Sequence, residues 1–330
     1  TASTEECLEA VDAASAAQPG WASVPPRQRA EVLRQCFELM VRESDAISDL
    51  IQRENGKALR QAVEEVYYAA EFFRWFSEET THLGGEFRTS PNGDEQIVFL
   101  PEPVGVVLLV TPSSFPAAIA TRKIAPALAA GCTCVLKPAP ETPLTALYLA
   151  DLVRRAGAPA GVLNVVLPDP PNDAVAAMMG HQALGKLSFT GSSAVGRVLL
   201  QLAGNHALQT SMGLGGNAPF LVLDDADLDV AVNAALLAKM RNGGASCIAA
   251  NRFHVHRSAA PEFTSRFSAR MAELSIGYER EPTADVGALV SANRRDDVHR
   301  LLAELVESGG QVVTGGGSSG FFFEPTVVAE

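Results

Sequence analysis

The chain has 330 residues, of which 47% are hydrophobic and 19% charged, and its net charge at pH 7 is -12. This length and composition allow a large buried core, which we expect to be divided between two domains. The 38 Asp and Glu residues outnumber the 26 Lys and Arg residues, and there is no long basic run. This balance argues against nucleic acid and membrane as partners and favours a small-molecule substrate.

The cysteines and the ends of the chain bear on the cellular compartment of the protein. Five cysteines are an odd number in a chain of this size, so we expect reduced thiols. No apolar stretch reaches the ~20 residues that cross a bilayer, and the N-terminus lacks a signal-peptide pattern, so we predict a cytoplasmic protein. The chain starts at Thr1 without Met and stops inside the strand-like EPTVVAE, which we interpret as cut or incomplete ends.

The first quarter of the sequence has helical periodicity. Helices are expected over 4–14, 25–55 and 57–79, where apolar residues recur three or four apart. Residues 84–105 then carry Pro91-Asn92-Gly93 between alternating segments, which predicts an exposed hairpin. We interpret this hairpin as a candidate arm for homo-oligomer formation.

From residue 104 onward, strand and helix patterns alternate. Apolar strands are expected over 104–112, 132–138, 161–167 and 186–191, with helices over 115–131, 142–157 and 174–185. Such a pattern predicts a Rossmann-type parallel sheet covered on both faces, which binds ligands at the carboxyl ends of its strands. A second α/β unit, incomplete at its C-terminus, follows, so we predict a cofactor domain over 1–217 and a catalytic domain over 218–330.

Cys247 lies in the segment Asn242-Gly243-Gly244-Ala245-Ser246-Cys247, between an expected helix and an apolar strand. The glycines let the backbone approach a substrate closely and leave N–H groups that can point at an oxyanion. A thiol placed there is a candidate nucleophile. A small hydrophobic residue in a tight turn would explain the same pattern, so the residues alone leave both interpretations open.

A phosphate site is a second candidate. Residues 188–196, SFTGSSAVG, follow an expected strand and open a helix, so free N–H groups there would face an anion such as a pyrophosphate. An ordinary strand-to-helix turn has the same composition. Lys137, at the end of an expected strand, is placed to donate to a ribose, although a solvated surface lysine is the commoner interpretation.

Other motifs favour structural roles. Gly213-Leu214-Gly215-Gly216-Asn217-Ala218 has the spacing of a dinucleotide fingerprint, but an extended apolar segment follows it where the fingerprint requires a helix. Cys132 and Cys134 alternate on an apolar strand, as do His254 and His256 on another. We therefore expect core and strand-face positions for them and no metal site.

The ordered motifs together resemble the NAD(P)-dependent aldehyde dehydrogenases, and most closely the succinate-semialdehyde dehydrogenase branch. The resemblance covers nearly the whole chain, from WFSEE at 75–79 and PEPVGVVLLVTP at 101–112 to FFEPTVV at 322–328. Between these lie FPAAIATRKIAPALAAGCTCVLKPAPETP at 115–143, LSFTGSSAVGR at 187–197, MGLGGNAPFLVLDDADLD at 212–229 and NGGASCIAANRF at 242–253.

The resemblance implies an oxidoreductase in which a cysteine thiolate adds to an aldehyde and the resulting thiohemiacetal gives hydride to NAD or NADP. An activated water then hydrolyses the thioester. Cys247 matches the catalytic cysteine. The resemblance further implies that Lys137 holds the adenosine ribose, that Gly191 and Ser192 lie under the pyrophosphate, and that Thr111 and Pro112 line the nicotinamide side.

Two positions depart from the family pattern. Relatives have Trp-Asn-Phe-Pro where this chain has Ser113-Ser114-Phe115-Pro116, so Ser114 replaces the Asn amide that binds the oxyanion. Relatives have Glu-Leu-Gly-Gly where this chain has a Gly213-Leu214-Gly215-Gly216 run, so the carboxylate that activates water is absent. Loss of one oxyanion donor costs ~10²–10³ in rate and loss of a general base ~10²–10⁴, so we expect strongly impaired aldehyde oxidation.

The cofactor region also departs from the pattern. The Gly-rich adenosine loop of relatives is replaced by Leu167-Pro168-Asp169-Pro170-Pro171, whose prolines remove N–H donors. Pro140 stands where many NAD-preferring relatives have a Glu, so NADP should be tolerated. The chain also ends before the family segment that contacts the nicotinamide ribose and before the strand that completes the oligomer, which again suggests a truncated protein.

Three hypotheses follow. The first is an aldehyde dehydrogenase whose oxidation of a small semialdehyde is impaired. The second is acyl transfer to a thiol such as coenzyme A, which needs no activated water; relatives that do this keep the Asn that Ser114 replaces. The third is a pseudoenzyme with a binding or structural role.

Overall fold

The structure, a computed structural model, describes residues 1–277 and 283–329. The chain divides into two compact units, the first containing Thr1–Ile47 and Glu65–Gly213 and the second containing Ser48–Glu64 and Leu214–Glu330. The sequence-based boundary at residue 217 lies close to the second division at Gly213. The sequence pattern did not indicate that Ser48–Glu64 belongs to the second unit, because helical periodicity carries no information about distant contacts.

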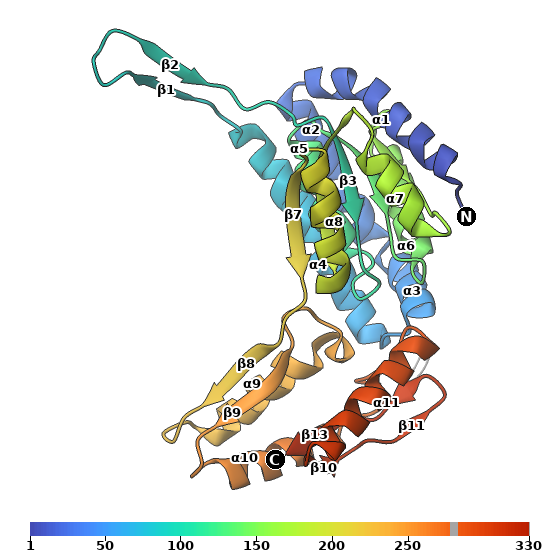
Figure 1. Ribbon diagram of the computed structural model, residues 1–330, viewed down its shortest axis with the longest axis vertical. Helices are drawn as coiled ribbons and strands as arrows, with labels where there is room; N and C mark the ends of the chain where they lie inside the picture. Colours follow the sequence, from blue (N-terminus) through green and yellow to red (C-terminus); the bar gives the residue numbers. More distant parts are fainter. Residues whose placement is uncertain (278–282, 330) are drawn as a thin grey trace. The chain divides into compact units, whose positions relative to one another are not determined.

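The first unit is built on a parallel sheet of the expected kind. Its strand order is β5-β4-β3-β6-β7, and β3 pairs in parallel with both β4 and β6. This order places a topological switch point between β3 and β6, because the chain winds outward from β3 in both directions. Figure 1 shows β3 and β7 of this sheet among the helices of the first unit. The strands are β3 (Val106–Val110), β4 (Thr133–Lys137), β5 (Leu163–Val165), β6 (Leu184–Gly191) and β7 (Gln209–Leu214).

Helices cover both faces of this sheet. Apolar side chains of α1, α7 and α8 share one core cluster with those of β3 and β6. On the opposite face α5 packs on β3 and β4, and α6 packs on β5. These helices are α1 (Thr4–Ser23), α5 (Ala118–Ala129), α6 (Pro143–Arg155), α7 (Pro171–Met179) and α8 (Ser193–Asn205). Cys132 and Cys134 are buried, as the alternating pattern predicted.

One helix prediction was wrong. The stretch 25–55 forms two helices, α2 (Pro26–Arg42) and α3 (Ser44–Asn55), separated at Glu43. The Glu43 carboxylate accepts two hydrogen bonds from the Arg155 guanidinium, at 2.8 Å each, and one from the Tyr148 hydroxyl at 2.7 Å. The break is therefore fixed by partners on α6, far away in the sequence. After Gly56, α4 (Leu59–Glu79) and the short η1 (Thr80–His82) follow.

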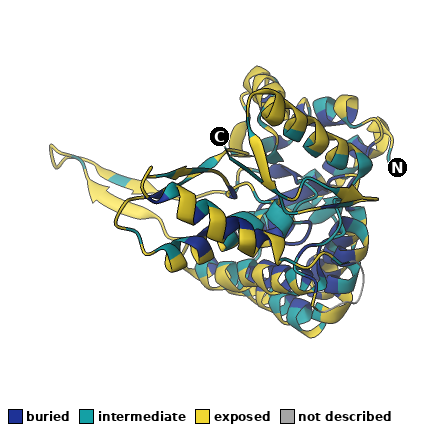
Figure 2. Cartoon of the chain, turned by 90° about the horizontal axis from the view of Figure 1, so that it is seen from below, coloured by how far each residue is buried: buried dark blue, intermediate teal, exposed yellow. Residues whose placement is uncertain are grey.

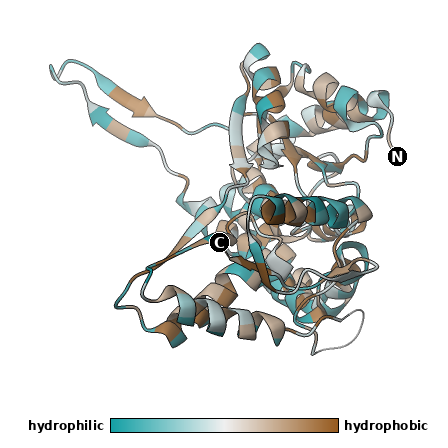
Figure 3. Cartoon of the chain, turned by 60° about the horizontal axis from the view of Figure 1, so that its bottom comes forward, coloured by the Kyte–Doolittle hydropathy of each residue, from teal (hydrophilic) through white to brown (hydrophobic). Residues whose placement is uncertain are grey.

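The predicted hairpin is confirmed. Strands β1 (Glu86–Thr89) and β2 (Gln96–Phe99) pair antiparallel, and Gly93 in the turn has a φ of 76°. Nearly every residue of the hairpin is exposed (Figure 2). Several of these side chains are hydrophobic, among them Phe87, Val98 and Phe99, so the ribbon shows apolar segments in Figure 3.

The second unit has a smaller parallel pair. β8 (Ala218–Val222) pairs with β9 (Ala250–Val255), and α9 (Leu228–Met240) and α10 (Ala260–Ala272) pack on this pair through a cluster that includes Phe253, Phe263 and Phe267. Next come α11 (Ala292–Glu307) and the antiparallel pair β10 (Gln311–Thr314) and β13 (Val327–Ala329). In the sequence, β11 (Ser318–Ser319) and β12 (Phe322–Phe323) come between β10 and β13, and they pair antiparallel with each other. Among the residues described, every helix is too short or too polar to cross a lipid bilayer.

Candidate active site

Cys247 lies on an exposed loop of the second unit, between the short helix η2 (Arg241–Gly244) and β9. The last three residues of η2, Asn242, Gly243 and Gly244, have φ values of 58°, 60° and 80°. Only glycine, and to a lesser degree Asn or Asp, adopts this left-handed region readily. The other four cysteines are buried, and burial raises the pKa of each of their thiols. Cys247 is therefore the thiol that can meet a substrate.

The loop that carries Ser114 belongs to the first unit. It runs from Thr111 at the end of β3 to Pro116, just before α5. The buried Glu65 carboxylate accepts hydrogen bonds from the backbone N–H groups of Ala117 and Ala118, at 2.9 and 3.1 Å. An acidic side chain on these N–H groups caps the start of α5 and therefore fixes the end of the Ser114 loop. Sequence reasoning did not single out Glu65.

Gly213 lies on β7, at the edge of the parallel sheet. A Cβ atom added there would come within 2.7 Å of Thr190 Oγ1 on the neighbouring strand β6. A side chain at position 213 would therefore project on the same face of the sheet as Thr190. Strand β7 was not predicted from the sequence, because Gln209, Thr210 and Ser211 are polar and form no apolar run.

Lys123 is a second residue that sequence reasoning did not single out. Its Nζ donates to Ser188 Oγ at 2.8 Å, and burial together with repulsion from Arg122 and Lys186 lowers its pKa to about 8. Ser188 and Thr190 are two residues apart on β6, so both face α5. Lys123 therefore lies on the same face of the sheet as the position where the family has its carboxylate. A lysine within the apolar pattern of α5 was the available signal.

The predicted cofactor residues gather at one edge of the first unit. Lys137, Thr111 and Gly191 lie at the carboxyl ends of the neighbouring strands β4, β3 and β6, and Val110 pairs with both Lys137 and Phe189. Pro112, Pro140 and Ser192 follow directly after these strands. This edge includes the switch point between β3 and β6, where open α/β sheets bind nucleotides. Burial lowers the pKa of Lys137, while Glu141 opposes that shift.

The residues at this edge fit a dinucleotide. A Cβ on Gly191 would lie 2.5 Å from Phe189 Cζ, so a side chain here would need Phe189 to move. Ser192 caps the 13-residue helix α8 by accepting from Val195 N at 3.3 Å. A helix N-terminus of this kind favours an anion. The 167–171 turn contributes less, because three of its five residues are prolines and have no N–H.

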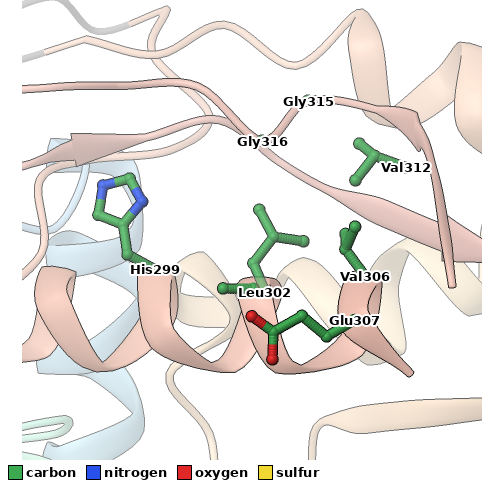
Figure 4. A pocket seen from close by; sticks show the side chains of 8 residues that line it. His299, Leu302, Val306, Glu307, Val312, Gly315 and Gly316 are labelled. Atoms are coloured by element: carbon green, nitrogen blue, oxygen red, sulfur yellow. The ribbon is translucent and has the colours of Figure 1, made fainter. Parts of the chain in front are cut away.

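The described residues also enclose a hollow. It has a volume of 580 Å³ in the second unit, between α11 and the segment around β10 (Figure 4). Leu302, Val306 and Val312 give it an apolar lining. None of the predicted site residues lines it, and we assign it no chemistry.

The two units thus divide the predicted site residues between them. Cys247 belongs to the second unit, whereas the first unit holds the other eight: Ser114, Gly213, Thr111, Pro112, Lys137, Pro140, Gly191 and Ser192.

Comparison with known proteins identifies the family. The model of the aldehyde dehydrogenase family matches residues 1–330. The chain is 49% identical to a succinate-semialdehyde dehydrogenase of Paenarthrobacter nicotinovorans, covering 100% of this chain and 74% of that protein. It is 41% identical to the NADP(+) succinate-semialdehyde dehydrogenase of Escherichia coli, covering 99% of this chain and 68% of that protein. A crystal structure of an E. coli NADP-dependent enzyme superposes with a TM-score of 0.96 at 40% identity, covering 99% of this chain and 68% of that one. The chain therefore belongs to the aldehyde dehydrogenase family.

Proposed function

We propose that the protein oxidises a small semialdehyde with NAD or NADP through Cys247, and that release of the acyl group from the cysteine is slow. The exposed thiol on its left-handed loop is the observation that carries this proposal. The substrate class is suggested by relatives named for succinate semialdehyde.

The first half of the reaction has its nucleophile in Cys247 but only a weakened oxyanion donor in Ser114. The Cys247 thiolate adds to the aldehyde carbon and forms a thiohemiacetal oxyanion, which Ser114 would stabilise less well than the amide it replaces. A nicotinamide cofactor, if bound there, would supply the hydride acceptor, and the acyl group would then remain on Cys247 as a thioester. Lys137, Gly191 and Ser192 would hold the ribose and pyrophosphate, with Thr111 and Pro112 beside the nicotinamide. Pro140 presents no charge that would repel a 2′-phosphate, so NADP would be tolerated as well as NAD.

The second half lacks its usual base. Hydrolysis of the thioester requires a water that loses a proton as it attacks, and Gly213 has no side chain that can accept that proton. The thioester should therefore form faster than it is hydrolysed. A first turnover followed by slow release is the kinetic signature of such an enzyme.

Stopped-flow measurement of NADPH tests the proposal. Succinate semialdehyde and NADP⁺ should give a burst of up to one NADPH per chain, a slow steady state and a succinyl adduct on Cys247 by mass spectrometry. Cys247→Ser should abolish the burst. Fast multiple turnover without a burst would contradict slow deacylation, and the absence of any burst or adduct would favour a pseudoenzyme.

Acyl transfer to a thiol is the second candidate, and the absence of a carboxylate at Gly213 favours it. If it is correct, adding coenzyme A should raise the steady-state rate and produce an acyl-CoA. A steady state unaffected by coenzyme A would remove this candidate.

A further inference from the structure

The turn that precedes Cys247 accepts a hydrogen bond from a lysine that is distant in the sequence. Lys57 is 5% exposed, and its Nζ donates to Asn242 Oδ1 at 2.7 Å. Both residues and Cys247 belong to the second unit, although 185 positions separate Lys57 from Asn242 in the sequence.

Asn242 is the residue of the turn that most needs such support. It is a non-glycine residue with a φ of 58° and is only 6% exposed. A left-handed conformation costs a residue with a Cβ roughly 1–2 kcal/mol, so the turn needs side-chain interactions that favour this conformation.

The lysine also fixes which way the Asn242 amide points. An ammonium group can only donate, so the amide oxygen must face Lys57. The amide nitrogen is then left to donate to the Ala245 carbonyl, at 3.0 Å. Because Ala245 N also donates to the Asn242 carbonyl at 3.0 Å, Asn242 holds Ala245 at both of its backbone groups. Cys247 follows two residues later.

The backbone on either side of Lys57 is held in place by contacts with residues 287 and 288. Ala288 N donates to Gly56 O at 2.8 Å, and a Cβ on Gly287 would lie 2.6 Å from Ala58 N, so the two segments are in direct contact. One turn further along, Gln61 Nε2 donates to the carbonyls of Asp285 and Met240, at 3.1 and 3.4 Å. These contacts fix the position of the segment from which Lys57 reaches Asn242.

We propose that Lys57 is a positioning residue for Cys247: through Asn242 it holds the turn that orients the thiol and the neighbouring N–H groups toward a substrate carbonyl. It does not touch the substrate. The inference rests on the proposed role of Cys247 as nucleophile.

Comparing two reactions of Cys247 can distinguish the orientation of its thiol from the exposure of that thiol. Both reactions use the Cys247 thiolate. Acylation by 4-nitrophenyl acetate also requires attack on a carbonyl in a defined direction and stabilisation of the resulting oxyanion, whereas alkylation by iodoacetamide requires only an accessible thiolate. We expect Lys57→Met to lower the rate of acylation by ~10–100-fold, since a misplacement of about 1 Å can cost ~10² in rate. Alkylation should stay within about threefold of wild type, because the substitution leaves Cys247 exposed and alkylation forms no oxyanion.

A matched control is available in the same unit. Lys239 Nζ donates to Asn251 Oδ1 at the same distance, 2.7 Å, but Asn251 lies on β9. Lys239→Met should leave the ratio of acylation to alkylation near the wild-type value. Asn242→Asp, which keeps an acceptor for Lys57 but loses the donor to Ala245, should lower the ratio and provides a second test should Lys57→Met not fold.

The outcomes are distinct. An unchanged ratio in the Lys57→Met and Asn242→Asp proteins, or an equal fall in Lys239→Met, would overturn the positioning role. Acylation of the wild-type protein without any NADPH burst would instead refute the proposed oxidation and leave the positioning test valid, because the ester reaction needs no cofactor.

Discussion

Replacing Gly213 by Glu should convert the slow acyl release into ordinary turnover. The substitution restores a carboxylate on β7, on the face of the sheet that Thr190 and Lys123 share. The φ of Gly213 lies outside the left-handed region, so a residue with a Cβ needs no backbone strain at this position.

The size of the gain follows from two opposing effects. A general base contributes ~10²–10⁴ in rate. Against this, the new Cβ would lie 2.7 Å from Thr190 Oγ1, so the threonine must turn away from its present rotamer. An off-rotamer side chain costs ~0.5–1.5 kcal/mol, which corresponds to roughly 2–13-fold. We therefore expect the steady-state rate to rise by ~10–10³-fold.

The assay compares burst and steady state in three proteins. Gly213→Glu should raise the steady-state rate of NADPH formation, so that the burst becomes a smaller part of the trace. Gly213→Gln has nearly the same volume but no base and should remain slow. Equal steady-state rates for the Glu and Gln proteins would refute the reasoning, because size alone would then account for the change.

Three further predictions concern single side chains. Ser114→Asn should raise the rate of the NADPH burst by ~10–100-fold by restoring an oxyanion donor, whereas an unchanged stopped-flow burst would exclude such a role for this position. Lys123→Met should alter the pH dependence of stability. Below pH 8 the folded protein bears the full cost of a buried ammonium, and between about 8 and the ordinary value of 10.5 only the unfolded chain stays protonated. The melting temperature of the wild type should therefore rise relative to Lys123→Met between these pH values, and parallel curves would contradict the assignment. Hydrogen bonds from Arg155 lower the pKa of Glu43 from 4.5 to about 2, so its contribution to stability is complete above pH 4.5 and is lost as the pH falls toward 2. Glu43→Gln should cost ~1–2 kcal/mol of unfolding free energy at pH 7, after allowance for partial exposure, and nothing near pH 2, which urea titrations at both pH values can check.

The parallel sheet and its binding edge were predictable from the sequence because their signals are local. Each buried strand is a short apolar run, and parallel strands bring their carboxyl ends to one edge, so Lys137 and Gly191 were expected at the same edge of the sheet. Thr111 was assigned to this edge only through the resemblance to the aldehyde dehydrogenases. The two glycines before Cys247 indicated a backbone that a substrate can approach closely, but not that Asn242 shares their left-handed conformation.

The supporting residues could not be predicted because their partners are distant in the sequence. Lys57 and Glu65 lie in an ordinary helical pattern, and only the folded chain brings them to Asn242 and to the start of α5. The break at Glu43 depends on Arg155 in the same way. Strand β7 was missed because an exposed edge strand can be polar, and such a segment has no apolar run.

The exposed hairpin has a consequence for how the polypeptide can be divided. Its tip, around Asn92 and Gly93, is a favoured place for proteolytic cleavage because exposed loop tips with small polar residues are readily cut. A cut there would leave α1 to α4 on one fragment and the whole parallel sheet on the other. The fragments should stay joined, because Trp21 and Arg29 donate to the carbonyls of Leu128 and Ala129, both at 3.2 Å, and Thr133 donates to the Ala14 carbonyl at 2.9 Å. The protein is thus suited to reconstitution from two separately expressed pieces.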